Sequence, residues 1–425
     1  MNEATEPSNL IQRHALPLVN EMLSESPVVV IQGARQVGKS TLIQMVMAQR
    51  GGQVLSLDQT TTRETALAHP DEFVTQVNAG HTLALDEVQR VPQLMRAIKA
   101  AVDDDRRPGR FLLTGSADLL HVSGSNESLA GRSETLDLWG LSQGEKLGRR
   151  DDFVTWLSQG VPSRRRSLEP CDYTSMIVAG GYPEAGRRQA RAAGRWFDGY
   201  LRSVTDHDAA EVSGLARLNR LQVLLRWLAA QTSHELVLAS ASRATGVPER
   251  SLPPYLRLLD DLYLTRSLPA WGRNLAKRVV GRPKAVVVDT GLAAHLTGAT
   301  VPTLADLQQR PRLGDLLETF VASELIKQQT WSETPYRLFH FRDAGSGSEV
   351  DLVVELADGR AIGIGVKASV TLGRSDFAGL TALRDSLGTG FVAGVVFYTG
   401  TEEIPWGDRL RALPVSALWQ ATDSQ

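Results

Sequence analysis

The sequence contains a single cysteine, Cys171, among its 425 residues, which excludes an internal disulfide and fits a reducing compartment. Its eight histidines are scattered without metal-ligand spacing, so we expect no zinc site. The N-terminus has no basic and then apolar signal, and no apolar run approaches the roughly 18 residues of a membrane span. These absences predict a cytoplasmic protein that neither is secreted nor crosses a membrane.

Charge of one sign is also lacking, because the formal net charge is −2. This balance excludes a protein that holds nucleic acid by an overall basic surface, although local basic clusters remain compatible with it. Hydrophobic residues make up 42% of the chain, which is enough to bury several cores. The length predicts about two to four domains.

One glycine-rich stretch stands in the setting of a phosphate-binding loop. It follows an apolar run typical of a strand, residues 28–31, and precedes a segment typical of a helix, residues 41–48. Glycines at 33 and 38 allow backbone angles closed to other residues, so that successive N–H groups can surround a phosphate at a helix N-terminus. The predicted nucleotide-binding residues are Gly33, Ala34, Arg35, Gln36, Val37, Gly38, Lys39, Ser40 and Thr41. Among them we expect Lys39 to contact the β- and γ-phosphates of ATP and Ser40 to ligate Mg²⁺.

A second motif, residues 83–87, indicates a buried strand that ends in two carboxylates. Asp86 is the expected Mg²⁺ ligand, and Glu87 is the expected catalytic group that polarises the attacking water. Taken alone, such a pair is more often a solvated strand end. Its place after the glycine-rich loop favours the functional interpretation.

The first domain continues with strands alternating with helices, a pattern that predicts a parallel sheet covered on both faces. Strands are expected at 54–57 and 111–116, with a helix at 92–102. Because the carboxyl ends of parallel strands share one edge, Thr114 and Ser116 should lie beside Asp86. Either could bond the γ-phosphate or the attacking water, and a simple Thr-Gly-Ser turn explains the segment equally well.

Four motifs, at 33–40, 85–87, 113–116 and 129–132, occur in an order that resembles a prokaryotic group of AAA-type ATP-binding proteins. The resemblance implies an α/β fold whose P-loop NTPase core is an additional-strand parallel sheet. It also implies that Ser116 is the sensor polar residue and that Arg132 reaches a γ-phosphate, in its own subunit or in a neighbour's. The family usually has proline where this chain has Ala34, and a proline near 138–142 that this chain lacks.

The expected domains are an N-terminal helix at 1–24, the ATPase core at 25–145, and a linker with a helical lid at 146–225. Residues 144–170, around the start of the third segment, contain charged stretches and predict loop or linker. A Gly-Gly-Tyr-Pro-Glu sequence at 180–184 is a further family landmark. It precedes a helix expected at 196–204, to which we assign only a positioning role.

Residues 226–300 predict a winged-helix-like domain. Apolar residues spaced by three and four predict a helix at 251–262, a turn precedes it, and segments 264–268 and 285–288 could form the wing. Such a helix can read the major groove through exposed residues such as Arg250 and Arg257. Packing as a lid over the nucleotide is the favoured alternative, because prolines at 253–254 and acids at 260–261 suit DNA poorly.

Residues 310–425 resemble the restriction-endonuclease-like α/β domain that ends many members of the same family. In that fold two strand carboxylates and a lysine hold Mg²⁺ against a phosphate. The second carboxylate should stand at 365, where this chain has glycine. We therefore predict a catalytically degenerate domain with a vestigial site. Its members would be Glu318, Glu349, Asp351 and Lys367, unless Glu349 replaces the missing acid.

Three functions remain open. The first is a Mg²⁺-dependent ATPase whose conformational cycle acts on DNA or on a protein partner, either as a monomer or as a homo-oligomer. The second is a nucleotide-bound switch or scaffold that barely hydrolyses ATP. The third is an ATP-gated, metal-dependent nuclease.

Overall fold

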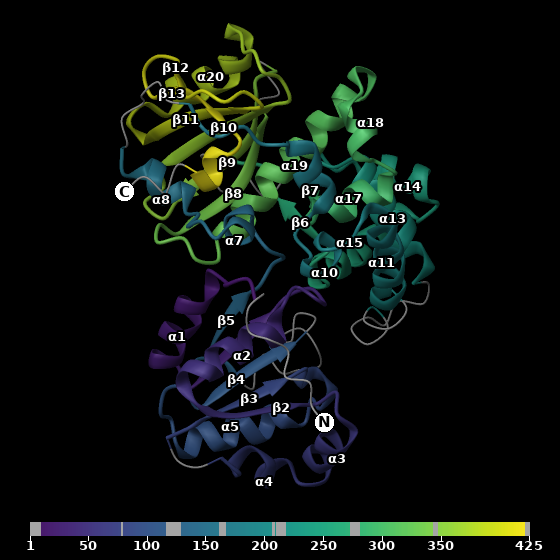
Figure 1. Ribbon diagram of the computed structural model, residues 1–425, viewed down its shortest axis with the longest axis vertical. Helices are drawn as coiled ribbons and strands as arrows, with labels where there is room; N and C mark the ends of the chain where they lie inside the picture. The colour runs from purple at the N-terminus through teal and green to yellow at the C-terminus, as the bar shows by residue number, and fades with distance from the viewer. Residues whose placement is uncertain are drawn as a thin grey trace.

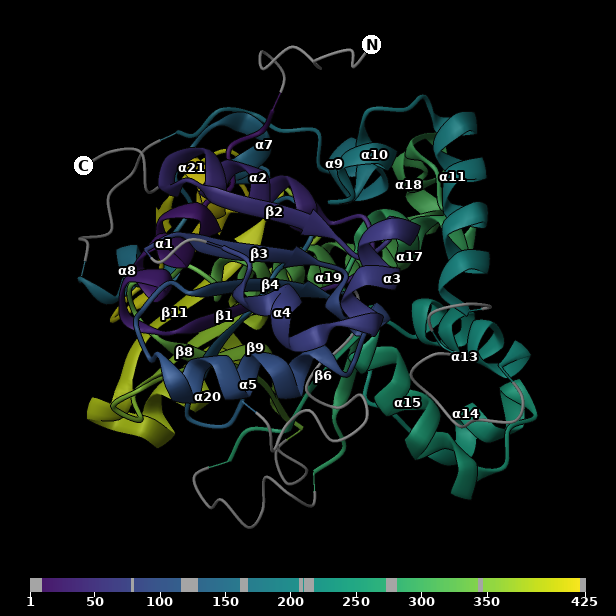
Figure 2. The same ribbon diagram turned by 90° about the horizontal axis from the view of Figure 1, so that it is seen from below.

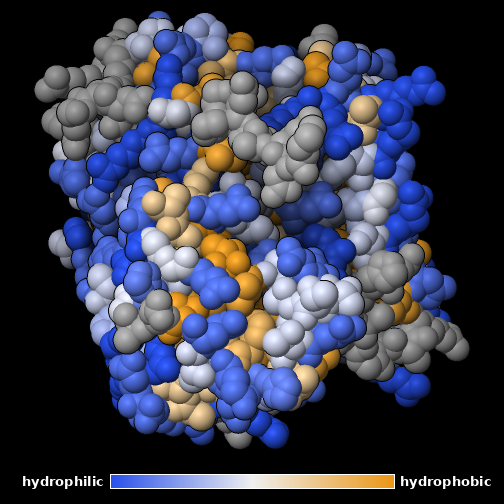
Figure 3. All heavy atoms as spheres, turned by 60° about the horizontal axis from the view of Figure 1, so that its bottom comes forward, coloured by the Kyte–Doolittle hydropathy of each residue, from blue (hydrophilic) through white to orange (hydrophobic). Residues whose placement is uncertain are grey.

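The computed structural model describes residues 10–77, 80–115, 129–160, 167–205, 209, 218–272, 281–342 and 347–420. Three parts follow one another along the chain, as Figure 1 shows: an N-terminal sheet with its helices, a helical middle part, and a C-terminal sheet. Figure 3 shows a face of the molecule on which hydrophilic residues dominate and hydrophobic residues gather in patches. Within the described ranges, no helix has the length and apolarity needed to cross a membrane.

The N-terminal part is a five-stranded parallel sheet with the order β2-β3-β4-β1-β5. Its strands are β1 (Val28–Gln32), β2 (Gly52–Ser56), β3 (Thr82–Asp86), β4 (Phe111–Gly115) and β5 (Ser133–Asp137). Its helices are α1 (Ala15–Glu25), α2 (Lys39–Arg50), α3 (Thr60–Ala68), α4 (Pro70–Thr75), α5 (Leu94–Asp104) and the 3₁₀ turn Val88–Arg90. The predicted parallel sheet is confirmed, with β4 inserted between β1 and β3.

Both faces of this sheet are covered, which explains why β1 is apolar at successive positions. Val29 and Ile31 pack in one hydrophobic cluster together with residues of α1 and α2. Val28 and Val30 pack in the cluster on the other face, which α5 completes. Alternating side chains of a strand point to opposite faces, so a doubly covered strand needs no polar positions. Because all five strands run parallel, their carboxyl ends meet at one edge.

The middle part is mainly helical and includes a two-stranded antiparallel ribbon, β6 with β7. Its elements are α7 (Gln143–Leu147), α8 (Phe153–Ser158), α9 (Tyr173–Ala179), α10 (Pro183–Gly186), α11 (Ala190–Ser203), α13 (Asn219–Ala230), α14 (Leu238–Thr245), α15 (Leu252–Asp261), β6 (Thr265–Leu268), β7 (Lys284–Val287), α17 (Thr290–Thr297), α18 (Val301–Ala305) and the 3₁₀ turns Glu249–Ser251 and Leu307–Gln309. The order α15, β6, β7 reproduces the expected succession of a helix and two strands, and α14 precedes them. Figure 2 shows α11, α13, α14 and α15 along one margin of the molecule.

The expectation of loop throughout 144–170 is wrong, because the stretch contains α7 and α8. Asp152 accepts a hydrogen bond from the backbone N–H of Thr155 and so caps α8. The buried ring of Phe153 lies 5.1 Å from that of Phe397 in the C-terminal sheet. Asp152 thus starts a helix that is held by aromatic packing.

The C-terminal part is a six-stranded mixed sheet with the order β12-β13-β11-β10-β9-β8. Its elements are α19 (Arg310–Gln328), β8 (Tyr336–Arg342), β9 (Glu349–Leu356), β10 (Ala361–Lys367), the 3₁₀ turns Arg374–Phe377 and Gly388–Gly390, α20 (Ala378–Leu387), β11 (Phe391–Tyr398), β12 (Ile404–Pro405), β13 (Leu410–Pro414) and α21 (Ala417–Gln420). From Leu316 onward α19 is buried almost throughout. It packs against β7 and α17 of the middle part and against β10, and so joins these two parts.

Candidate functional site

The glycine-rich loop lies between β1 and α2, and its glycines meet two separate demands. Gly33 has a φ of +152°, and a Cβ at this position would lie 2.1 Å from the carbonyl oxygen of Leu138. Gly38 has a φ of +101° and immediately precedes α2. Only glycine meets both the close approach of the chain after β5 and the left-handed turn into the helix. The loop N–H groups are thereby set at the positive end of α2.

Lys39 is the first residue of α2 and is buried within this loop. Its ammonium nitrogen donates hydrogen bonds to the carbonyl oxygens of Gly33, at 2.8 Å, and Ala34, at 2.9 Å. The side chain of Lys39 therefore lies along the inner side of the loop. An anion in the loop would find this positive charge directly beside the backbone N–H groups.

Two of the predicted Mg²⁺ ligands are in contact. The hydroxyl of Ser40 donates to a carboxylate oxygen of Asp86 at 2.9 Å, although 46 positions separate them in the sequence. Thr114, at the end of β4, donates its hydroxyl proton to the other oxygen of Asp86. The same hydroxyl accepts the backbone N–H of Glu87 at 3.2 Å. Thr114 thus holds the two carboxylate residues in position from the neighbouring strand.

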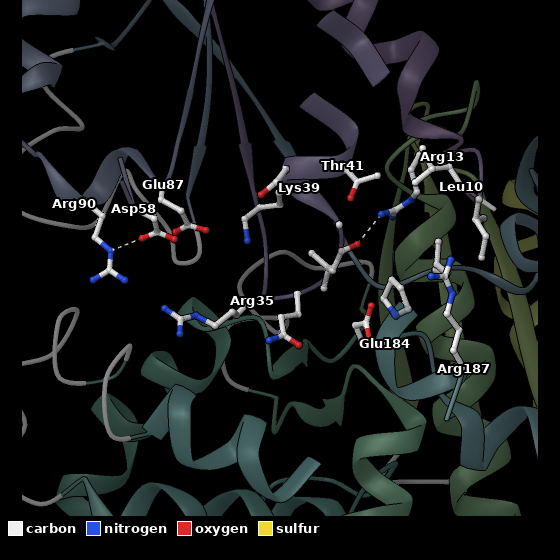
Figure 4. Close-up of a pocket in the computed structure, with 17 residues that line it drawn as sticks. Leu10, Arg13, Arg35, Lys39, Thr41, Asp58, Glu87, Arg90, Glu184 and Arg187 are labelled. Atoms are coloured by element: carbon white, nitrogen blue, oxygen red, sulfur yellow. Dashed lines mark hydrogen bonds and ion pairs between the residues drawn. The ribbon is translucent and has the colours of Figure 1, made fainter. Parts of the chain in front are cut away.

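A cavity of about 520 Å³ opens along the loop. Figure 4 shows Lys39 between a side with Asp58, Glu87 and Arg90 and a side with Arg13 and Thr41. Its lining residues are Leu10, Ile11, Arg13, Arg35, Gln36, Val37, Gly38, Lys39, Ser40, Thr41, Asp58, Glu87, Arg90, Leu141, Pro183, Glu184 and Arg187. The apolar members and the charged members suit a ligand with an apolar ring system and a charged tail.

Arg13 precedes α1 and holds the loop in place through hydrogen bonds. Its guanidinium donates to the carbonyl oxygen of Val37 at 2.7 Å, to that of Trp139 at 2.8 Å, and to the Glu145 carboxylate at 2.8 Å. Because a peptide unit is planar and trans, fixing the Val37 carbonyl also fixes the Gly38 N–H on the opposite side. Arg13 is therefore a positioning residue for the loop. Sequence analysis missed it, since its partners are up to 132 positions away.

A tight turn at 180–183 brings α10 to the rim of the cavity. Asp289, which follows β7, accepts the N–H of Gly181 at 2.6 Å and that of Leu292 at 2.8 Å. A Cβ on Gly180 would lie 2.4 Å from the Asp289 carboxylate, and Gly180 has a φ of +64°. This geometry explains the Gly-Gly-Tyr-Pro-Glu landmark as a turn that carries Glu184 to the cavity.

The structure brings together most of the predicted nucleotide-binding residues. Those from 35 to 41 line the cavity, and Gly33 and Ala34 contribute the carbonyls that hold Lys39. Ser116 lies outside the described residues. The cavity also contains Arg90 and Arg187, which sequence analysis missed because single arginines after a strand or in a short helix carry no pattern.

Arg132 lies away from the loop. It directly precedes β5, whose first residue pairs with Val28 at the amino end of β1, whereas the loop follows the carboxyl end of β1. Its guanidinium pairs with the Asp103 carboxylate on α5 at 2.6 Å. A γ-phosphate in the same subunit is therefore out of its reach in this arrangement, which corrects that alternative. The alternative of a neighbouring subunit remains a prediction.

The carboxylates predicted for the C-terminal site do gather, around an ammonium group. Lys284 Nζ lies 2.9 Å from an oxygen of Glu318 and 3.3 Å from one of Glu349. Burial raises the pKa of Glu318 to about 8, with Asp351 adding to the shift. The pKa of Lys284 is raised despite its burial, because Glu318 and Asp351 lie nearby. A side chain from β7 thus supplies the positive charge of this cluster.

Asp351 occupies the sheet side of the cluster. One of its carboxylate oxygens accepts the N–H of Val366 at 2.7 Å. A Cβ on Gly365 would lie 3.9 Å from the same oxygen, so the missing acid would have stood here. No group of three or more His, Cys, Asp or Glu residues suited to a metal occurs in the described part of the chain. Lys367 is half-buried at the end of β10.

Three segments of the chain match protein families, and one of these segments contains the phosphate loop. Residues 25–147 match the family described as an AAA domain. Residues 171–303 and 313–418 match two families described as domains of unknown function. The matched segment 25–147 therefore contains the loop, Asp86 and Glu87. The restriction-endonuclease-like resemblance of the C-terminal part is not confirmed by these matches.

Relatives of similar length have no assigned role. Uncharacterized proteins of Mycobacterium bovis and Mycobacterium tuberculosis are 28% identical over 412 residues, which is 96% of this chain and 84% of theirs. Among solved structures, a Walker-type ATPase of Pyrococcus abyssi has 16% identity and a TM-score of 0.43, and covers 69% of this chain and 97% of its own. AMPPCP-bound DnaA of Aquifex aeolicus has 15% identity and a TM-score of 0.29, and covers 61% and 92%.

Proposed function

We propose that the protein binds ATP with Mg²⁺ at the glycine-rich loop and hydrolyses it to drive a conformational cycle that acts on DNA or on a protein partner. The 2.9 Å contact between Ser40 and Asp86 carries the proposal, because it unites the two motifs at one point. The match of residues 25–147 to an AAA domain supports it.

The residues present fit a magnesium nucleotide. A hydroxyl and a carboxylate, from Ser40 and Asp86, are oxygen ligands of the kind Mg²⁺ prefers. Mg²⁺ usually takes one or two protein oxygens and completes its shell with phosphate and water, so two groups suffice. When bound, the ion would neutralise charge that develops on the phosphates.

The chain's own groups have distinct roles in this proposal. Lys39 exchanges its two carbonyl partners for phosphate oxygens when ATP enters, which keeps a buried ammonium hydrogen-bonded. Thr114 keeps Asp86 and the Glu87 backbone in place. Glu87 then orients and polarises the attacking water.

A nucleotide-bound switch that hydrolyses slowly is the second candidate, and one contact favours it. The side-chain amide of Gln89 donates to a carboxylate oxygen of Glu87. The carboxylate oxygen that accepts this hydrogen bond is not free to orient the attacking water until Gln89 moves. Single-turnover measurement on Gln89→Ala decides between the two: faster cleavage than in the native protein indicates a restrained switch, and unchanged cleavage indicates an ATPase.

We infer that the C-terminal carboxylate cluster does not cleave nucleic acid. Lys284 already supplies the charge that a metal would bring to Glu318 and Glu349. The position of the second strand acid is Gly365. Incubation of the protein with plasmid and Mg²⁺ or Mn²⁺ should give no nicking. Nicking that Asp351→Ala abolishes would restore the nuclease hypothesis.

The ATP proposal is tested by equilibrium binding of labelled ATP and by phosphate release with Mg²⁺. We expect saturable binding that Lys39→Ala abolishes, and phosphate release that Glu87→Gln abolishes while binding persists. Arg96→Ala, which removes an exposed cation of α5 in the same domain, is the matched control and should match the native protein. Turnover that survives in Lys39→Ala and Glu87→Gln would refute the site assignment.

A homo-oligomer is the remaining part of the proposal. Arg132 lies far from its own loop, so the γ-phosphate that it contacts would belong to a neighbouring copy. Molecular mass in solution with and without ATP tests this idea. Nucleotide-dependent assembly that Arg132→Ala weakens supports it, and a monomer in both conditions contradicts it.

A further inference from the structure

The segment matched by the first domain of unknown function is basic within a chain of net charge −2. Residues 171–303 hold seventeen Lys and Arg residues, fifteen of them Arg, against eleven Asp and Glu residues. Positive charge is therefore concentrated in the middle part. Arginine predominates, and its planar guanidinium suits bidentate contacts with phosphate.

Helix α11 displays part of this charge on one face. Arg191, Arg195 and Arg202 are exposed and lie four and seven positions apart. At about 100° per residue these spacings place all three within an arc of roughly 40°. The rise of about 1.5 Å per residue spreads them over roughly 16 Å of helix. We call Arg191, Arg195 and Arg202 the arginine face.

The opposite side of α11 is fixed by aromatic packing. Phe197 and Tyr200 are buried, and Trp196 stacks on Tyr200 with ring centroids 5.2 Å apart. The hydroxyl of Tyr200 lies 2.7 Å from that of Tyr182, in the turn that precedes α10. The helix cannot rotate its arginines inward without breaking this cluster. The arginine face is thus a fixed feature of α11, a helix that lies along one margin of the molecule in Figure 2.

The arginine face has an excess of positive charge among the residues that the structure describes. Within the described ranges no carboxylate pairs with any of its three guanidinium groups. The exposed acid of α11 nearest to it, Asp198, is instead bonded to His295 at 2.9 Å. Asp198 lies on the same side of the helix, three positions after Arg195 and four before Arg202, so in the described part of α11 the face carries three cations against one carboxylate.

We propose that the arginine face binds the sugar–phosphate backbone of duplex DNA. Phosphate contacts by arginine give affinity without sequence reading, as a flat row of cations requires. Single-stranded nucleic acid is disfavoured, because binding it usually needs exposed aromatic side chains on which bases stack. The aromatic residues of α11 face the interior instead.

The arginine face is joined to the nucleotide site at the end of α11. Arg35, in the phosphate loop, donates to the hydroxyl of Ser203 at 2.9 Å. A ligand that shifts Arg35 therefore shifts the last turn of α11, which carries Arg202. DNA affinity should change with the nucleotide bound. This coupling rests on the proposed function, whereas the contact with DNA does not.

The test is fluorescence anisotropy of a labelled duplex DNA with the full-length protein, titrated without nucleotide from 50 to 200 mM salt. The variant Arg191→Gln/Arg195→Gln/Arg202→Gln is compared with a charge-matched control, Arg96→Gln/Arg337→Gln/Arg374→Gln. All six arginines are exposed. Each lost phosphate contact lowers the slope of log affinity against log salt by about 0.9. The native protein should therefore lose roughly forty-fold more affinity than the α11 variant across this range, and the control should behave as native.

The outcomes separate cleanly. Equal affinity and salt slope in the native protein and the α11 variant would overturn the proposal. Tighter binding to single strands or to duplex RNA than to duplex DNA would also overturn it, as would a preference for an acidic polypeptide. Lys39→Ala should bind DNA as the native protein does without nucleotide. If ATP fails to bind while the α11 variant still loses DNA, the ATP proposal fails alone and the arginine face stands.

Discussion

Replacing Arg13 by methionine tests how the phosphate loop is held. The change removes the guanidinium but keeps a long apolar side chain, so it deletes three hydrogen bonds without leaving a large cavity. Its main consequence falls on Glu145. This carboxylate is fully buried, and its partner Arg13 is only 4% exposed.

The loss of stability depends on how many hydrogen bonds Glu145 retains in the variant. Removing one partner of a buried ion pair costs about 3–5 kcal/mol. Glu145 keeps two backbone donors, the N–H of His14 at 2.9 Å and that of Ser142 at 3.0 Å. We therefore expect the lower end, about 3 kcal/mol. For a cooperative folding unit of about 150–250 residues, this loss of stability corresponds to a fall of roughly 6–12 °C in melting temperature.

Differential scanning fluorimetry of a double-mutant cycle checks the reasoning. Arg13→Met/Glu145→Gln leaves no unpaired charge and should regain more than half of the lost melting temperature. ATP affinity should fall in both variants, because neither holds the Val37 carbonyl and with it the Gly38 N–H. A double variant that melts as low as Arg13→Met would refute the ion-pair argument. Native ATP affinity in Arg13→Met would refute the positioning role.

Three further predictions concern other parts of the chain. Gly180→Ala should destabilise the protein more than Gly148→Ala. Both glycines have a φ of +64°, but only at Gly180 would a Cβ clash with other atoms. The difference between the melting temperatures of the two variants measures the cost of that clash. Glu318 keeps its proton up to a pH of about 8 in the folded protein, because burial raises its pKa, whereas the unfolded chain loses it near 4.5. The free energy of unfolding should therefore fall as the pH rises between these values, and less steeply in Glu318→Gln, as melting curves at pH 5 and 8 would show. Asp289→Asn should weaken ATP binding by loosening the turn before α10, and native affinity in a titration would contradict this.

The phosphate loop and the strand ends could be predicted from sequence because their signals are local. Glycines at 33 and 38 stand beside the strand and helix that they connect. Asp86 ends an apolar strand, and Thr114 ends another. Parallel pairing then brings these ends to one edge without any further information.

Residues that act across the fold could not be predicted in this way. Arg13 reaches Glu145 over 132 positions, and no periodic pattern specifies a contact at that distance. Lys284 belongs to a strand of the middle part, yet its ammonium lies among acids of α19 and β9. Gly365 indicated a lost metal ligand. The sequence does not show which cation pairs with the remaining acids, because that depends on the packing of β7 against α19 and β9.

Strand β7 connects the nucleotide cavity with the C-terminal carboxylate cluster, two sites that the sequence presents as separate. Lys284 begins β7 and contacts Glu318 in the carboxylate cluster. Asp289 follows the other end of the strand and holds the Gly181 N–H in the turn before α10. A strand of four residues is too short and too well paired with β6 to absorb a displacement internally. We therefore expect a movement of α10 at the nucleotide cavity to be transmitted through β7 to Lys284 and its acids.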